Sequence, residues 1–284
     1  MCTPLPHMPE SPVILFGLGF TATRLVRCLL ATGRSVFAAT RNPGRFAALS
    51  AEGLVVSDFN AEAFPRGAVI AHTIPPVEEP TQSALHDFLL SIAPRRLVYV
   101  SATSVYGDLA VVDADSPVVP TGEASIMRYE EERWIANGPW ESLILRAAAI
   151  YGPGRGAHRR LASHQAPPLN QRRGPSGLVS RIHVDDLARL VARGLDSRLC
   201  GAFPVADQEP CSTEAILRWC VQYLELDPAT FDISRTISSG RRVDGSLIIN
   251  ELGVDLAYPN YRGGIAQCIR EEQGSQEAPW PVRL

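Results

Sequence analysis

The chain has 284 residues, of which 45% are apolar and 20% are charged, and its net charge is −3. This composition is typical of a globular protein and indicates one large domain, or a main domain with a smaller one attached. The slightly acidic balance gives no electrostatic basis for binding nucleic acid or an anionic membrane, so we expect neither partner.

The remaining bulk features indicate a cytoplasmic protein without a metal site. The first residues, MCTPLPHMPESP, have neither the basic segment nor the apolar segment of a secretory signal. No apolar stretch approaches the ~18 residues that span a membrane. The six cysteines include no C-x-x-C pair, which argues against zinc and favours free thiols.

The chain contains no lysine, because all 27 of its Lys and Arg residues are arginine. Any mechanism that needs a lysine is therefore excluded in its usual form. Such mechanisms include a Schiff base, a P-loop and a catalytic Tyr–Lys pair.

Short apolar runs alternate with amphipathic stretches from Ser11 onward. The apolar runs predict six strands, at residues 12–19, 35–41, 53–59, 68–76, 95–104 and 142–150. The amphipathic stretches predict helices at residues 21–32, 81–93 and 123–136. Continuous apolar strands joined by helices are buried on both faces, so the pattern predicts a parallel, doubly wound α/β sheet of the Rossmann type.

The composition shifts after Tyr151 to a segment rich in Gly, Pro and Arg, which predicts a loop. Further elements are predicted at residues 181–184, 185–195, 202–207 and 212–224, with a short strand and a last helix within 241–270. This portion is too small for a large core of its own, and we expect a small C-terminal substrate-side lobe.

The stretch GLGFTA, residues 17–22, joins the first predicted strand to the first predicted helix. Gly17 allows a tight turn, and Gly19 lets the backbone approach a pyrophosphate at the start of the helix, which begins near Phe20. Ala22 is small enough for close packing of the helix on the strand. In this context the motif predicts a dinucleotide site.

The end of the second strand indicates which dinucleotide is bound. A 2′-hydroxyl selects for Asp or Glu there, and a 2′-phosphate for Arg. This chain has Arg41, with Arg45 one turn on and no acidic residue before Glu52. NADP is therefore favoured over NAD, and Asp58 is expected to face the adenine. We predict an NAD(P)-binding Rossmann domain at residues 11–155, the lobe at 156–272 and interleaved with the sheet, and tails at 1–10 and 273–284.

Four stretches together resemble the short-chain dehydrogenase/reductase superfamily, in its extended NAD-dependent epimerase/dehydratase-like form. They are GLGFTA, VSATSVYGD, LILRAAAIYGPGR and RIHVDDLA. The tail RRVDGSLIINELGVDLAYPNYRGGI resembles the ending of an atypical branch of that group. The resemblance implies a Ser or Thr four residues before Tyr106 and a Tyr-x-x-x-Lys on the next helix. Ala102 occupies the first position, and no lysine exists for the second.

Two alignments of the Tyr-x-x-x-Lys motif are open. If the acidic residues before Trp134 match the family glutamate, the tyrosine position falls near Glu123 or Ala124, and the lysine position near Met127 or Arg128. The alternative pair is Tyr129 and Arg133, which share a helix face. Arginine can stabilise a tyrosinate but cannot relay a proton. We favour RYEEER as a charged outer helix face, which leaves Ser101, Thr103 and Tyr129 as weak catalytic candidates.

Two residues are weak candidates for contact with a substrate: Tyr106 and Arg155, the latter in the YGPGR stretch. Arg159, Arg160, Arg172 and Arg173 follow on the loop and could hold an anionic group. Arg146 is expected to be paired internally. In RIHVDD, His183, Asp185 and Asp186 are expected to be structural, with Asp185 near a helix start.

Two functions stay open. One is an NAD(P)-dependent oxidoreductase or epimerase/dehydratase-like enzyme that acts on a carbonyl or sugar-type small molecule with a degenerate Ser/Tyr/Lys tetrad. The other is an inactive NADP-binding sensor or partner-binding module, which the missing lysine favours. A homodimer is possible in either case.

Overall fold

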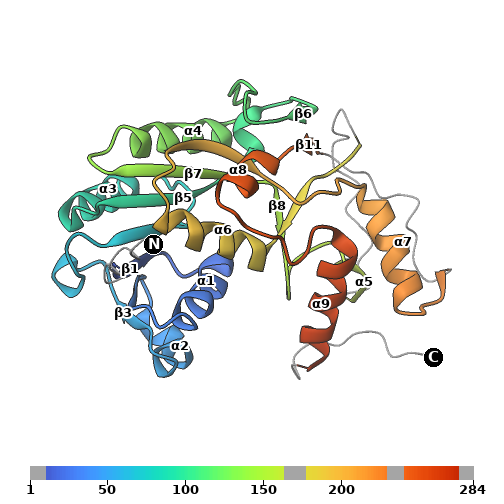
Figure 1. Ribbon diagram of the computed structural model, residues 1–284, viewed down its shortest axis with the longest axis horizontal. Coiled ribbons are helices and arrows are strands. Elements are labelled where there is room, and N and C mark those ends of the chain that lie inside the picture. Colours follow the sequence, from blue (N-terminus) through green and yellow to red (C-terminus); the bar gives the residue numbers. More distant parts are fainter. Residues whose placement is uncertain (1–10, 163–176, 229–239, 275–284) are drawn as a thin grey trace, which may run out of the picture. The chain divides into compact units, whose positions relative to one another are not determined.

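The computed structural model describes residues 11–162, 177–228 and 240–274 (Figure 1). A seven-stranded sheet has the strand order β10-β7-β5-β4-β1-β2-β3. The pairs between neighbouring strands from β3 to β5 are all parallel. The predicted doubly wound α/β class is confirmed. The seven strands are β1 (Val13–Phe16), β2 (Val36–Ala39), β3 (Val55–Ser57), β4 (Val69–His72), β5 (Arg96–Ala102), β7 (Glu141–Ala147) and β10 (Gly201–Val205).

The described chain forms two compact units that alternate along the sequence. Unit 1 contains the residues up to Ser101, together with Glu130–Ile144 and Val191–Gly201. Unit 2 contains Ala102–Tyr129, Leu145–Leu190 and the residues from Ala202 onward. Unit 2 thus includes the predicted C-terminal lobe except for Val191–Gly201. It also contains the VYG stretch, the first part of the helix that follows that stretch, and residues 145–155.

Unit 1 is built on strands whose side chains are completely buried. All four residues of β1 have zero exposed surface, which explains their continuous apolar sequence. Helix α1 (Phe20–Leu30) begins directly after the glycine turn and buries Ala22, Leu25, Val26 and Leu29 at helical spacing. The other helices that lie in this unit are α2 (Ala47–Ala51), α3 (Thr81–Ile92) and the C-terminal part of α4 (Glu123–Ala136).

Unit 2 has two small parallel sheets of two strands each. Strand β6 (Val111–Val112) pairs with β11 (Arg242–Val243), and β8 (Ala149–Tyr151) pairs with β9 (Arg181–His183). An apolar cluster in this unit joins α7 (Thr213–Tyr223) to α9 (Tyr261–Gly274). Ser212 caps α7 by accepting a hydrogen bond from the backbone N–H of Ala215. The remaining helices are α5 (Arg159–Ala162), α6 (Val184–Asp196, shared with unit 1) and α8 (Ser246–Glu251).

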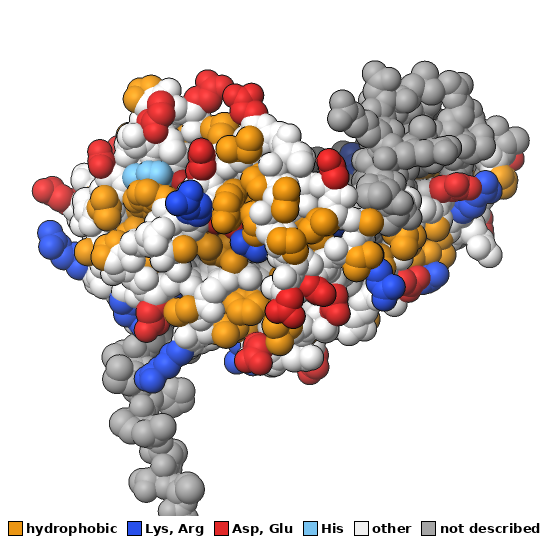
Figure 2. Space-filling model, turned by 90° about the horizontal axis from the view of Figure 1, so that it is seen from above, with side chains coloured by type: hydrophobic (Ala, Val, Ile, Leu, Met, Phe, Trp, Pro, Cys, Tyr) orange, Lys and Arg blue, Asp and Glu red, His pale blue; other side chains and the backbone are white. Residues whose placement is uncertain are grey.

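The surface carries charges of both signs. On the face seen in Figure 2, acidic and basic side chains are interspersed, and apolar side chains lie between them. No helix among the described residues is long and apolar enough to cross a membrane. Among the described cysteines, all of which are free thiols, Cys200 is exposed, Cys28 is half-buried and three are buried.

A buried arginine caps the end of α6 within unit 1. Arg96, at the start of β5, is 1% exposed. It donates to the carbonyl oxygens of Gly194 (2.7 Å) and Leu199 (2.6 Å) and to the hydroxyl of Ser197 (2.9 Å). The last carbonyls of a helix have no partner within the helix, and a cation there also offsets the helix dipole.

We expect Arg96→Met to lower the free energy of unfolding by about 3 kcal/mol, because it removes the buried guanidinium and its hydrogen bonds to Gly194, Ser197 and Leu199. Arg95→Met is the matched control, since Arg95 is exposed and, among the described residues, its side chain hydrogen-bonds only to Ser11. It should change stability by less than ~0.5 kcal/mol. Urea denaturation measures both, and equal losses would show that the buried cap is unimportant.

Candidate functional site

The glycine turn requires glycine at its first position for conformational reasons. Gly17 has φ +93°, which is strained for any residue with a side chain. A Cβ there would lie 2.6 Å from Cγ1 of Ile74. The backbone N–H of Gly17 donates to the carbonyl of Ala39, which ties the turn to the end of β2. The chain's own fold therefore accounts for this glycine.

Gly19 differs, because neither its backbone conformation nor any described neighbour requires a glycine there. Its φ is −93°, and a Cβ placed there would have no atom within 4 Å. Gly19 is exposed and precedes the first turn of α1, which contains no acidic residue. The first N–H groups of a helix have no partner within the helix. Gly19 thus leaves an open approach to a helix N-terminus, as an anionic group would need.

The other predicted cofactor residues lie at or near the same turn. Ala22 is fully buried, and Phe20 is half-buried at the start of α1. Arg41 follows β2, is exposed, and makes no side-chain hydrogen bond or ion pair with any described residue. Asp58 follows the paired strand β3 and is also exposed. Arg41 and Asp58 thus both follow the carboxyl ends of neighbouring strands.

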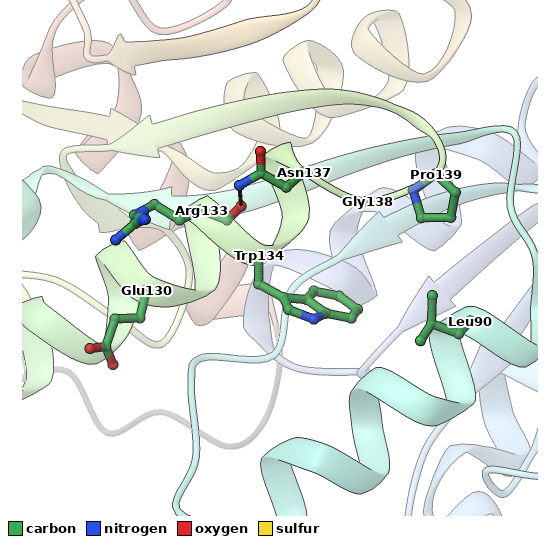
Figure 3. Close-up of a pocket in the computed structure, with 7 residues that line it drawn as sticks. All are labelled: Leu90, Glu130, Arg133, Trp134, Asn137, Gly138 and Pro139. Carbon is green, nitrogen blue, oxygen red and sulfur yellow. Dashed lines mark hydrogen bonds between the residues drawn. The ribbon is translucent and has the colours of Figure 1, made fainter.

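The inner face of α4 corrects our reading of the RYEEER stretch. Glu131 and Glu132 are only 4% and 2% exposed, so this stretch is not a charged outer face. Glu130 and Arg133 are exposed and line a groove with Trp134 and with Leu90 of α3 (Figure 3). Helical geometry places residues 131, 132 and 135 inward while 130 and 133 face solvent.

Glu131 is held by three side chains in the interior of unit 1. Its Oε2 accepts from Nε2 of His86 and from Nε2 of Gln82, each at 2.7 Å. Its Oε1 lies 3.3 Å from Nε2 of His72, an ion-pair contact without the alignment of a good hydrogen bond. Burial would raise the pKa of Glu131, but the two imidazoles outweigh it and hold that pKa below its usual range. Burial lowers the pKa of His72.

Glu132 has a separate partner at the end of β5. The hydroxyl of Ser101 donates to Oε1 of Glu132 at 2.5 Å, and Ser101 is 2% exposed. A short hydrogen bond to a carboxylate is strong and fixes the hydroxyl. The Ser101 hydroxyl is therefore already hydrogen-bonded within unit 1 and is not free to contact a substrate. A match of Glu132 to the family glutamate places the tyrosine position at Ala124 and the lysine position at Arg128, neither of which can do the usual chemistry.

The predicted catalytic and substrate residues of unit 2 differ in burial and in hydrogen bonding. Thr103 begins a short 3₁₀ turn after β5 and is half-buried, and its hydroxyl has no hydrogen-bond partner among the described residues. Tyr129 is half-buried against an apolar cluster that includes Val105 and Val112. Tyr106 is fully buried, and its hydroxyl accepts from Nη1 of Arg146 at 3.1 Å. Tyr106 is thus placed to pack rather than to touch a substrate, whereas Arg146 is paired internally as predicted.

The YGPGR turn is fastened to the last helix of unit 2. Arg155 is exposed, and its backbone bridges to Gly152. Glu272 of α9 accepts from the N–H of Gly154 (2.6 Å), from His158 (3.0 Å) and from Arg159 (2.9 Å). Arg159 is therefore committed to Glu272 and is not available as an anion ligand. Arg172 and Arg173 lie outside the described residues.

The RIHVDD stretch is structural, as predicted. Both oxygens of Asp186 accept from backbone N–H groups, those of Ala257 (2.8 Å) and Tyr258 (2.9 Å). Nδ1 of His183 accepts from the N–H of Asp185. In the part of the chain that the structure describes, no three His, Cys, Asp or Glu side chains are arranged to hold a metal ion.

Unit 2 also contains a polar pocket that the sequence did not indicate. Its lining includes Asp113, Asp207, Arg242, Asp244, Ser246 and Asn250. Burial raises the pKa of Asp207 to about 8. Both carboxyl oxygens of Asp207 are buried, so the polar groups that a ligand could reach are those of the other lining residues. Such a lining suits a ligand that carries hydroxyl groups.

Comparison with known proteins shows the family. No protein-family model matches the chain. A functionally unknown conserved protein from Silicibacter pomeroyi DSS has 30% identity and a TM-score of 0.74, over 92% of this chain and 99% of that one. The chain belongs to the same family as that protein.

Solved structures at lower identity share the fold. A putative NAD-dependent epimerase/dehydratase from Methylobacillus flagellatus has 19% identity and a TM-score of 0.69, over 93% of this chain and 99% of that one. The Bordetella bronchiseptica enzyme WbmG, solved with NAD, has 16% identity and a TM-score of 0.71, over 95% and 96%. These structures confirm the predicted Rossmann-type fold.

Two curated proteins are similar in sequence. Protein YeeZ of Escherichia coli (strain K12) is 31% identical over 168 residues, which is 58% of this chain. The match spans 59% of the length of YeeZ. A 3-diazoavenalumate denitrifying reductase from Streptomyces sp is 29% identical over 226 residues, covering 66% of this chain and 72% of the reductase.

The two glycines of the turn should respond differently to the same substitution. We expect Gly17→Ala to lower the free energy of unfolding by about 2–3 kcal/mol, because the added Cβ is strained and meets Ile74. Gly19→Ala should change it by less than ~0.5 kcal/mol, since its Cβ enters open space. Thermal and urea denaturation test this. A large loss for Gly19→Ala would contradict the open approach.

Proposed function

We propose that the chain is an NADP-dependent oxidoreductase or epimerase/dehydratase-like enzyme that acts on a carbonyl or sugar-type substrate. The observation that carries the proposal is Gly19, a glycine that the fold itself does not need, at an open helix N-terminus after β1. A pyrophosphate fits this place because it needs close approach to backbone N–H groups. The superfamily fold supports the same site.

The residues present fit a dinucleotide with a 2′-phosphate. Gly17 and Gly19 would admit the pyrophosphate, with Phe20 and Ala22 opening the helix beneath it. Arg41 would pair with the 2′-phosphate, because its guanidinium is exposed and uncommitted among the described residues. Asp58 would face the adenine. When bound, the nicotinamide supplies or takes up a hydride at a carbon that bears oxygen.

The proton of such a reaction cannot follow the usual Tyr–Lys route. Arginine stays protonated and does not relay a proton. The Ser101 hydroxyl is occupied by Glu132, and Tyr129 packs against apolar side chains. Thr103, whose hydroxyl has no partner among the described residues, or a water molecule is the remaining candidate to polarise the carbonyl. The polar pocket of unit 2 supports a hydroxyl-bearing substrate.

A second function is favoured by Ala102 and the absence of lysine. The chain would then bind NADP as a sensor or partner-binding module without turnover. The two functions differ in NADPH oxidation across a panel of ketones, aldehydes and nucleotide sugars. Turnover with any member that Thr103→Val abolishes, with cofactor affinity unchanged, would exclude the sensor. A cytoplasmic location and a homodimer stay predictions.

The dinucleotide site predicts the effect of filling the open position. Gly19→Val should abolish NADPH binding, a loss of about a hundredfold or more, because the side chain occupies the place of the pyrophosphate. Stability should be nearly unchanged, which urea denaturation checks. A folded variant that binds NADPH as tightly as the wild type would show that the turn is not the phosphate site.

The cofactor preference depends on Arg41. We expect NADPH to bind tighter than NADH by about tenfold to a hundredfold, since a charged pair contributes on the order of 1–3 kcal/mol. Arg41→Ala should remove the preference, while Arg45→Ala, a matched exposed arginine one turn on, should retain most of it. Fluorescence titration measures all three proteins. Equal wild-type affinities would contradict the assignment.

A further inference from the structure

The loop after β4 forms one wall of the glycine turn. The N–H of Thr73 donates to the carbonyl of Phe16 (3.0 Å), and its hydroxyl donates to the carbonyl of Gly17 (3.3 Å). The side chain of Ile74 fills the space beside Gly17 in which a Cβ would lie. A shift of residues 73–74 would therefore move the turn itself.

His72 connects this wall to α4. Its Nδ1 accepts from the N–H of Ile74 at 3.2 Å, so the neutral ring must carry its proton on Nε2. That nitrogen lies 3.3 Å from Oε1 of Glu131, which gives the tautomer a charged partner. The ring is enclosed by Phe16 and Tyr99. His72 thus joins a helix carboxylate to the backbone beside the turn.

The far end of the same loop is attached to the same carboxylate. The N–H of Val77 donates to Oε1 of Gln82 at 3.0 Å, which orients the amide. Nε2 of Gln82 then donates to Oε2 of Glu131 at 2.7 Å. Glu131 therefore anchors the loop at residue 74 through His72 and at residue 77 through Gln82. His86 completes the set and stacks on Trp134 at the groove shown in Figure 3.

We infer that Glu131 and His72 are positioning residues for the dinucleotide turn, and that protonation of His72 releases the turn and weakens dinucleotide binding. The inference rests on the proposed function for the identity of the ligand. A doubly protonated ring presents N–H at Nδ1, and the N–H of Ile74 then loses its acceptor. The titratable groups that face His72 among the described residues are Glu131 of α4, His86 of α3 and Tyr99 of β5.

The sign of the pH dependence follows from the environment of His72. Burial lowers its pKa below the usual value, so the native arrangement favours the neutral ring. Affinity should be full above the usual histidine pKa and should fall as the pH drops from that value through the lowered pKa of the buried ring. One proton gives a fall of at most about tenfold per pH unit.

The test measures NAD+ affinity by calorimetry from pH 8 to pH 5.5. NAD+ is the probe because it lacks the 2′-phosphate, whose own titration near pH ~6 would interfere. Wild-type affinity should fall towards the acid end of this range, by at most about tenfold and by clearly more than twofold. His72→Asn should show less than a twofold change, since an Asn oxygen can accept from the N–H two residues on but does not titrate. His86→Gln, which keeps a donor for Glu131, should retain the wild-type fall.

A second measurement needs no nucleotide. Amide hydrogen exchange of residues 72–74 and 77 in the free protein should be about tenfold faster in Glu131→Gln than in the wild type at pH 7.5. After correction for intrinsic rates, exchange of the same amides in the wild type should also become faster in acid. In His72→Asn it should not. If the wild type binds neither NAD+ nor NADPH at any pH, the proposed function fails while the exchange data still decide on the loop. Unchanged exchange in both variants, or equal pH dependence of wild type and His72→Asn, would overturn the inference.

Discussion

Unit 1 depends on two adjacent carboxylates, Glu131 and Glu132, that α4 buries against the sheet. A buried carboxylate is strongly unfavourable unless it is paired and hydrogen-bonded. Each therefore fixes a partner at the carboxyl edge of the sheet: Glu131 holds His72 at the end of β4, and Glu132 holds Ser101 on β5. These contacts set the register of α4 and, through Glu131, the loop beside the glycine turn. The same contacts engage the Ser101 hydroxyl and the His72 imidazole, which could otherwise take part in proton transfer.

The fold could be predicted because its signals are local. Continuous apolar runs, such as residues 13–16, mark strands covered on both faces, and helical spacing marks α1. Gly17 was predictable for the same reason, since a tight turn between strand and helix needs a positive φ. The structure adds that Gly19 is free of such a need. That distinction requires coordinates, because the sequence does not show what a Cβ would meet.

The inner face of α4 could not be predicted, because its partners are distant in sequence. Glu131 meets His86, 45 residues away, and Glu132 meets Ser101, 31 residues away. A run of three glutamates is typical of a solvated face, and helix periodicity alone does not show which carboxylates turn inward. The burial of Tyr106 was missed for a similar reason, since its partner Arg146 lies 40 residues away on β7. The signal that could have indicated this cluster was His72 at the end of an apolar strand, because a buried imidazole needs a buried polar partner.

The central claim is that the turn from Gly17 to Ala22 binds a dinucleotide. A crystal structure of the chain grown with NADP tests it most directly. The account predicts the pyrophosphate against the backbone at Gly19 and the first turn of α1, with the 2′-phosphate beside Arg41. NADP bound elsewhere on the chain, or no nucleotide at the turn at saturating concentration, would contradict it.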